Sequence, residues 1–255
     1  MLPIPLHPLP DEPSIYPYSA LHLVPARALL VLAPHPDDEV LGCGGLVAAL
    51  LDAGVPVHVV VVSDGALGGN VQERERESRQ AARALAGPRP PPSMEFWGEP
   101  DRGVIASARL VQRMSQAMID SGADWVLAPS PYEIHPDHRV VAVAAATAFA
   151  SAHGEDSGAQ LAFYEVGHPL FANLLVDITP VLARKAAALQ CFPSQLAVQD
   201  YGQQVLALNR FRSYTLARGV THAEAYQVHN SKAVSAGLAQ LIASTAAGVI
   251  SRLGY

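Results

Sequence analysis

Two short segments, well separated along the chain, combine side chains that bind transition metals and move protons. The first reads PHPDDE over residues 34–39, and the second reads HPDH over residues 135–138. Histidine nitrogen and aspartate oxygen are common ligands of Zn²⁺, and catalytic zinc sites keep three protein ligands and one open position. Each segment holds two such side chains three residues apart, close enough to reach one point from a tight turn. Together they predict a metal site built from His35, Asp38 and one histidine of the second segment.

A metal at these ligands would support hydrolysis, because it lowers the pKa of bound water from 15.7 to about 7. The reaction also needs a base, and Asp37 lies beside Asp38. Adjacent residues of a turn point in different directions, so one can bind the metal while the other contacts the water. The spare histidine, His135, can hydrogen-bond the substrate carbonyl or protonate the leaving amine. Asp137 can orient a histidine, as carboxylates near metal sites commonly do.

Each segment alone also has a simpler structural interpretation. Proline favours turns and aspartate often caps helices. Asp38 and Glu39 suit the first turn of a helix, whose dipole favours acidic side chains. Because both segments follow a predicted buried strand, their joint occurrence favours a functional site over two unrelated turns.

Strands and helices alternate in the predicted order of elements. Apolar runs predict buried strands at residues 28–34, 55–65 (ending in a turn), 94–98 and 124–130. Helical spacing marks residues 41–53, 73–85, 105–120 and 139–152. This alternation is typical of a parallel sheet with helices on both faces. We therefore predict an α/β fold, with one Rossmann-like, mostly parallel sheet flanked by helices in a single domain.

Ligands of such sheets bind outside the carboxyl ends of the strands. Polar, ionisable residues follow all four predicted strands: the two segments above, SDG at 63–65 and PDRG at 100–103. Four turns that share one edge of the sheet therefore converge on one candidate site.

The rest of the chain is less regular. Strands are predicted at 161–166 and 174–179, and helices at 181–190 and 199–218. We expect three parts: a proline-rich arm (1–26), one domain (27–230) and an alanine-rich C-terminal helix (231–255). The uncharged character of the last part suggests an interface and hence a homo-oligomer.

The composition excludes several classes of protein. The chain has 255 residues, 50% hydrophobic and 16% charged, which suits a sizeable core and not a disordered chain. A formal net charge of -6 argues against general nucleic-acid binding. We expect no signal peptide and no membrane span. Cys43 and Cys191 form no Cys-x-x-Cys motif, and we expect free thiols in a cytoplasmic protein. The glycines at 42–45 lack the full dinucleotide fingerprint, because residue 47 is valine.

At these motifs the chain resembles the LmbE/PIG-L family of zinc-dependent N-acetylglucosaminyl deacetylases. The matching pieces occur in the family's order: APHPDDE (33–39), VVSDG (61–65), the R-x-x-E of Arg74 and Glu77, PDRG (100–103) and HPDH (135–138). The resemblance is strong over residues 29–143 and weak beyond them. It implies Zn²⁺, or another divalent transition metal, bound by His35, Asp38 and His138.

The resemblance also implies roles for the remaining site residues. Asp37 would be the general base, and His135 would assist the carbonyl or the leaving group. Arg74 and Asp101 match positions that contact the sugar or its substituent. Asp137 and Glu39 are expected to contact the metal-binding and catalytic side chains and to hold them in position.

The function that this resemblance implies is removal of the N-acetyl group from an N-acetylglucosamine-type conjugate, a small molecule. The alternatives are another metal-dependent amide hydrolase on the same scaffold and a non-catalytic sugar-binding protein.

Overall fold

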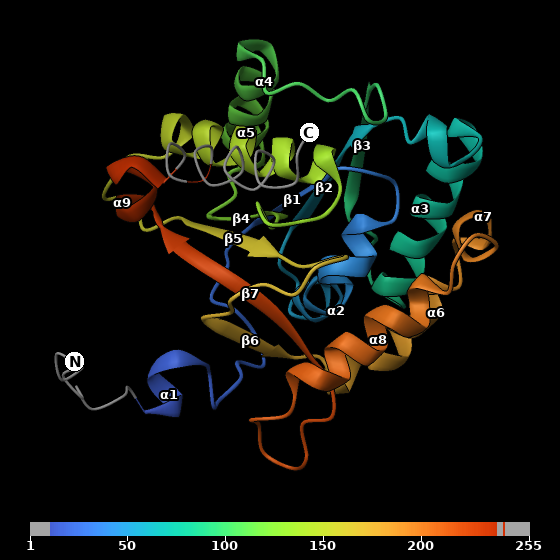
Figure 1. Cartoon of the computed structure of the whole chain (residues 1–255), viewed down its shortest axis with the longest axis vertical. Coiled ribbons are helices and arrows are strands. Elements are labelled where there is room, and N and C mark those ends of the chain that lie inside the picture. The colour runs from blue at the N-terminus through green and yellow to red at the C-terminus, as the bar shows by residue number, and fades with distance from the viewer. Residues whose placement is uncertain (1–10, 239–241, 243–255) are drawn as a thin grey trace, which may run out of the picture.

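A seven-stranded sheet organises the protein, which we describe from a computed structural model over residues 11–238 and 242 (Figure 1). Its strand order is β3-β2-β1-β4-β5-β7-β6. The strands are β1 (Leu29–Ala33), β2 (Val57–Ser63), β3 (Ser93–Glu99), β4 (Trp125–Pro129), β5 (Gln160–Tyr164), β6 (Leu174–Asp177) and β7 (Ala223–Asn230). The first five strands pair in parallel, whereas β7 runs antiparallel to both β5 and β6. The predicted α/β class with a mostly parallel sheet is confirmed.

Helices cover both faces of this sheet, as Figure 1 shows. One face packs against α2 (Asp38–Asp52), α3 (Val71–Ala86), α6 (Leu182–Leu189) and α8 (Tyr201–Arg212). The other packs against α4 (Ala108–Ser121) and α5 (Pro136–Ala152). Shorter elements are α1 (Glu12–Ile15), η1 (Ala66–Gly68), η2 (Thr179–Val181), α7 (Pro193–Leu196), α9 (Ser231–Ala233) and the π-helical turn η3 (Val234–Leu238).

Strand β1 shows why the central strands read as unbroken apolar runs. Its five residues are all buried. Leu29 and Val31 belong to the core under α2, whereas Leu30 and Leu32 belong to the core under α4 and α5. Successive side chains of a strand point to opposite faces, so a strand between two helical layers must be apolar throughout.

The helices begin at identifiable caps. Asn70 accepts a hydrogen bond from the backbone N–H of Glu73 at the start of α3, and Ser107 caps α4 in the same way. Helix α5 begins at Pro136, three residues before the predicted start, because His135 acts as its N-cap and proline suits the first helical position.

Helix α2 is interrupted at Cys43, whose φ of −142° and ψ of 17° are not helical. The backbone N–H groups of Gly45 and Leu46 donate instead to the Glu224 carboxylate, at 2.7 and 2.8 Å. The Lys185 ammonium donates to the Leu41 carbonyl at 3.0 Å and to Glu224 at 2.6 Å. A fully buried ion pair therefore satisfies the backbone groups that the break releases.

The arm and the C-terminal segment are each described only in part. In the arm, Leu21 bridges Val176 of β6. The predicted C-terminal helix has only its first residues in the described part, as α9 and η3. Residues 1–10, 239–241 and 243–255 lie outside the described residues, so the boundaries of the arm and of the C-terminal helix stay predictions. Within the described part, no helix has the length and apolar character needed to cross a bilayer.

Candidate active site

The two metal-ligand segments meet at the point where the strand order reverses. Strands β1 and β4 are neighbours; the chain continues from β1 toward β2 and β3, and from β4 toward β5 on the other side. Open α/β sheets bind ligands at this switch point. Residues 34–39 follow β1 and residues 130–138 follow β4, so both segments lie at this crevice.

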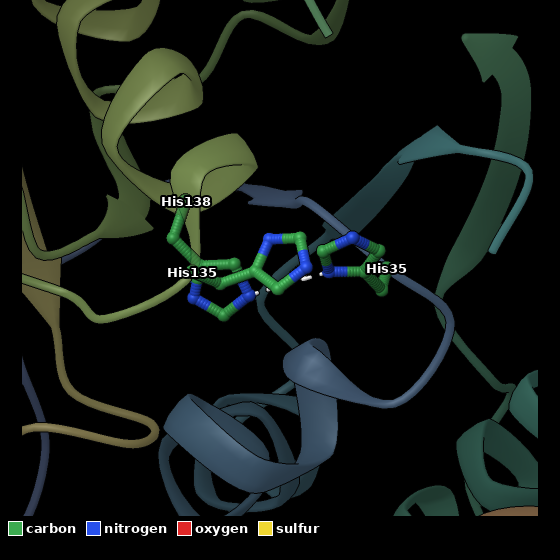
Figure 2. Close-up of side chains that lie close together, drawn as sticks. All are labelled: His35, His135 and His138. Atoms are coloured by element: carbon green, nitrogen blue, oxygen red, sulfur yellow. Dashed lines mark hydrogen bonds between the residues drawn. The ribbon is translucent and has the colours of Figure 1, made fainter. Parts of the chain in front are cut away.

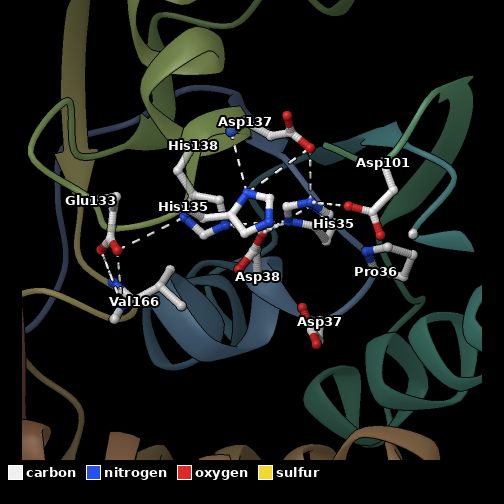
Figure 3. Close-up of polar contacts among 12 residues, drawn as sticks. His35, Pro36, Asp37, Asp38, Asp101, Glu133, His135, Asp137, His138 and Val166 are labelled. Carbon is white, nitrogen blue, oxygen red and sulfur yellow. Dashed lines mark hydrogen bonds and ion pairs between the residues drawn. The ribbon is translucent and has the colours of Figure 1, made fainter. Parts of the chain in front are cut away.

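Three ligand atoms form a compact triangle there (Figure 3), and two of them belong to the rings of His35 and His138 (Figure 2). The Nδ1 atom of His35 lies 3.3 Å from Oδ2 of Asp38 and 3.3 Å from Nε2 of His138. The same Asp38 oxygen lies 3.1 Å from His138 Nε2. All three residues are buried.

The triangle matches what a tetrahedral divalent ion requires. Bonds of about 2.0–2.1 Å in tetrahedral geometry separate neighbouring ligand atoms by about 3.3 Å. Two imidazole nitrogens and one carboxylate oxygen also form a donor set that suits Zn²⁺ and related transition metals. Two further groupings bring metal-binding atoms close together: His35 with His135 and His138, and His35 with Asp101, His135 and Asp137. The residues present therefore fit a metal ion.

Asp37 occupies a strained position beside the triangle. Its φ of 135° lies in a region that residues other than glycine rarely adopt, and such outliers cluster at functional sites. The Glu39 carboxylate accepts a hydrogen bond from the Asp37 N–H at 3.0 Å and so holds this peptide in place. Glu39 is itself buried, and this burial raises its pKa to about 7.

Arg74 is buried behind Asp37. Its guanidinium donates to the carbonyls of Gly65 and Pro36, each at 2.9 Å, and to Oδ2 of Asp37 at 3.2 Å. The side chain is 4% exposed. Arg74 thus fastens the turns after β1 and β2 to each other and positions the Asp37 carboxylate. Its predicted contact with the sugar stays a prediction.

Two carboxylates face the second nitrogen of His35. Its Nε2 lies 3.2 Å from Asp137 Oδ2 and 3.3 Å from Asp101 Oδ1. The Asp137 carboxylate also accepts the Arg102 N–H at 2.7 Å, and that of Asp101 accepts the Leu67 N–H at 3.1 Å. These bonds join the turns after β2, β3 and β4 around one imidazole (Figure 3).

His135 lies at the more open side of the site. Its side chain is 25% exposed, against 7% for His138. Its Nδ1 accepts the Asp137 N–H at 3.2 Å, and its ring meets the ring of His35 edge-on with centroids 4.5 Å apart. The ring is therefore fixed beside the triangle while remaining reachable from solvent.

Glu133 has no role in the sequence-based prediction, yet the structure places it beside the site. Its carboxylate lies 3.9 Å from Nδ1 of His138. It also accepts hydrogen bonds from the N–H groups of Val166, Gly167 and His168. These partners lie on the loop after β5, so no local spacing in the sequence could indicate the contact.

The ionisable groups of the site shift one another's pKa values. Burial alone would raise the pKa of Asp38, but His138 and His35 hold it well below its usual range. Burial, reinforced by the charge of Asp38, raises the pKa of Asp37 well above its usual range. Burial opposes protonation of His35, yet the carboxylates around its two nitrogens raise its pKa to about 11. Burial and the neighbouring imidazoles lower the pKa of His135 to about 4.

Comparison with known proteins finds a matching family model and several similar proteins. The PIG-L model, described as GlcNAc-PI de-N-acetylase, matches residues 30–149. The diacetylchitobiose deacetylase of Thermococcus kodakarensis is 25% identical over 195 residues, which are 66% of this chain and 70% of that protein. The 4-oxalmesaconate hydratase of Pseudomonas putida is 26% identical over 238 residues, or 80% and 89% of the two chains.

A solved structure has the same fold. The N,N'-diacetylchitobiose deacetylase from Pyrococcus horikoshii aligns with a TM-score of 0.71 and 24% identity, over 81% of this chain and 85% of that one.

Proposed function

Because the PIG-L family model matches residues 30–149 of this chain, we propose that it is a metal-dependent deacetylase that hydrolyses the N-acetyl group of an amino-sugar conjugate. The observation that carries the proposal is the triangle of His35, Asp38 and His138 with the strained Asp37 beside it. A metal-ligand set and a separate carboxylate in one turn are what hydrolysis of an amide by water needs.

We assign the ion to the triangle rather than to the sets that include His135. Its three atoms are 3.1–3.3 Å apart, whereas Nδ1 of His135 is already bonded to the Asp137 N–H. A divalent ion supplies a water of lowered pKa and polarises the amide carbonyl. The family implies zinc, and the donor set suits it.

The chain's own residues would manage the protons. The Asp37 carboxylate, held by Arg74, accepts a proton from the attacking water. The exposed edge of the His135 ring donates a hydrogen bond to the carbonyl oxygen, where negative charge develops. When the C–N bond breaks, the nitrogen takes a proton from Asp37 or His135, and acetate and the free amine leave.

The two relatives compared above carry different names, one a deacetylase and the other a hydratase. The family model that matches residues 30–149 is described as a de-N-acetylase, so we favour deacetylation over hydration for this chain.

Release of primary amine from a panel of N-acetylglucosamine conjugates tests the proposal. We expect release with zinc present, loss of release after chelation, and recovery when zinc is restored. The variant His138→Ala should lose both the bound metal and the activity. If metal-loaded protein releases amine from no conjugate, the assignment to N-acetyl sugars is wrong. Hydration of 4-oxalmesaconate, the compound in the second relative's name, by the same sample would favour that relative's reaction.

Other properties of the protein stay predictions. These are zinc as the working metal, a homo-oligomeric state and a cytoplasmic location.

A further inference from the structure

The imidazole of His138 has two nitrogens with different surroundings. Its Nε2 faces Asp38 and His35 in the triangle. Its Nδ1 is buried and has no hydrogen-bond partner among the described residues. The closest acidic group to it is the Glu133 carboxylate, with Oε2 at 3.9 Å, which is longer than a hydrogen bond (Figure 3).

A metal bound through Nε2 would impose a definite proton arrangement on this ring. A neutral imidazole carries one proton, and a nitrogen that binds metal cannot hold it. The proton of His138 must then be on Nδ1, which becomes a donor in a buried site. A buried donor without an acceptor is costly, and metal-binding histidines usually donate their second N–H to a carboxylate or carbonyl.

Glu133 is held firmly in a position to be that acceptor. Its side chain is 1% exposed. Its Oε1 accepts the Val166 N–H at 2.6 Å and the His168 N–H at 3.3 Å, and the Gly167 N–H lies 3.1 Å from both oxygens. A carboxylate with these bonds cannot swing away, so its second oxygen stays directed at His138 (Figure 3).

We propose that Glu133 is a positioning residue that fixes the tautomer and orientation of His138 for metal binding and links this ligand to the loop after β5. The inference rests on the proposed metal site. Asp137 and Asp101 provide carboxylate acceptors at His35, whose second nitrogen lies within 3.3 Å of both. Glu133 provides the corresponding acceptor for His138. For a hydrogen bond to form, the separation of 3.9 Å must shorten to about 3 Å.

A purely structural role for Glu133, as an anchor for the loop 166–168, makes a different prediction. The variant Glu133→Gln separates the two roles. Its amide oxygen can still accept the backbone N–H groups, so the loop stays anchored. Its NH₂ group then meets the Nδ1–H of His138, donor against donor, and the support for the ligand is lost.

The test measures the zinc dissociation constant by competition with a chelator, and the unfolding temperature of the metal-free protein. We expect Glu133→Gln to weaken zinc binding by about 10–100-fold. The unfolding temperature of its metal-free form should stay close to that of the unmodified protein. Glu133→Ala should weaken zinc binding and also lower the unfolding temperature of the metal-free protein, because it releases the loop as well.

Glu165→Gln is the matched control. Glu165 is a buried carboxylate of the same region, paired with Arg212, and it accepts the Leu170 N–H at 3.0 Å. Among the contacts of the described residues it makes none with the triangle. We expect this variant to lower the unfolding temperature while keeping the zinc affinity.

Two results would overturn the inference: unchanged zinc affinity in Glu133→Gln, or an equal loss of affinity in Glu165→Gln. Neither measurement requires a substrate. If the unmodified protein binds zinc but deacetylates no conjugate, the proposed function fails while the role of Glu133 is still decided by these affinities.

Discussion

Lys185→Met should be among the most destabilising single substitutions in this protein. The Lys185 ammonium and the Glu224 carboxylate are both 0% exposed and lie 2.6 Å apart. Methionine fills much of the space of the lysine stem but leaves the Glu224 charge buried without its counter-ion. It also leaves the Leu41 carbonyl, at the break in α2, without the donor that Lys185 provides at 3.0 Å.

The magnitude follows from these two losses. Removing one partner of a buried ion pair costs about 3–5 kcal/mol. An orphaned carbonyl alone accounts for about 1–3 kcal/mol of such a loss. The backbone N–H groups of Gly45 and Leu46 and the Tyr226 hydroxyl still donate to Glu224, so we do not expect a cost above this range. For a chain of this size, the loss corresponds to a fall in unfolding temperature of roughly 6–20 °C.

Urea unfolding followed by tryptophan fluorescence measures this cost, with the linear extrapolation to water. Pairing Lys185→Met with Glu224→Gln provides the internal control, because glutamine removes the uncompensated charge while keeping an acceptor for the backbone. The double variant should be more stable than the sum of the two single costs predicts, by at least about 1 kcal/mol. A cost below about 1 kcal/mol for Lys185→Met, or simple additivity in the double variant, would refute this account of the break in α2.

Three further predictions concern other parts of the protein. Asp37→Asn should retain bound zinc, measured by elemental analysis, but lower kcat for amine release by at least about 100-fold, the lower end of what general-base catalysis contributes; near-normal turnover would remove Asp37 from the role of base. Gly45→Ala should lower the unfolding temperature, because a Cβ there would lie 2.4 Å from Ile178 Cγ2 and 2.9 Å from the Glu224 carboxylate; an unchanged midpoint in a thermal scan would contradict this. His153→Leu should reduce the loss of stability at acid pH. Burial lowers the pKa of His153 below 6.5 in the folded protein, so below pH 6.5 the unfolded chain binds a proton that the folded protein does not. The stability of the unmodified protein therefore falls as the pH decreases toward the folded-state pKa. Chemical unfolding at pH 7.5 and 5.5 checks this last point. An equal loss of unfolding free energy between the two pH values in both proteins would contradict it.

The central strands could be placed from the sequence because burial on both faces leaves an unmistakable apolar run. Strand β1 lies inside the predicted 28–34, and β4 inside the predicted 124–130. Strand β7 was not predicted, because its sequence AEAYQVHN mixes polar and apolar residues. Its one fully buried charge, Glu224, is tolerated only through the ion pair with Lys185, which no local pattern reveals.

The same distinction applies to the site. The ligand pairs inside each segment are local, so their spacing alone indicates a candidate metal site. The distance of 3.1 Å between Asp38 and His138 depends on the pairing of β1 with β4, which spacing within one segment does not contain. Local spacing does not predict a role for Glu133 either, because its partners are the backbone N–H groups of the distant loop 166–168.

The placement of the triangle across β1 and β4 also has a thermodynamic consequence for the whole chain. His35 and Asp38 come from one turn and His138 from another, so an unfolded chain holds them far apart and the complete site exists only in the native state. If the triangle binds a metal as proposed, free ion concentration and folding are linked: an ion at 100 times its dissociation constant adds about 2.7 kcal/mol to the stability, and at 1,000 times about 4.1 kcal/mol. Chelated and ion-saturated samples of one sequence would therefore behave as proteins of different stability, and variants can be compared only at a fixed free-ion concentration.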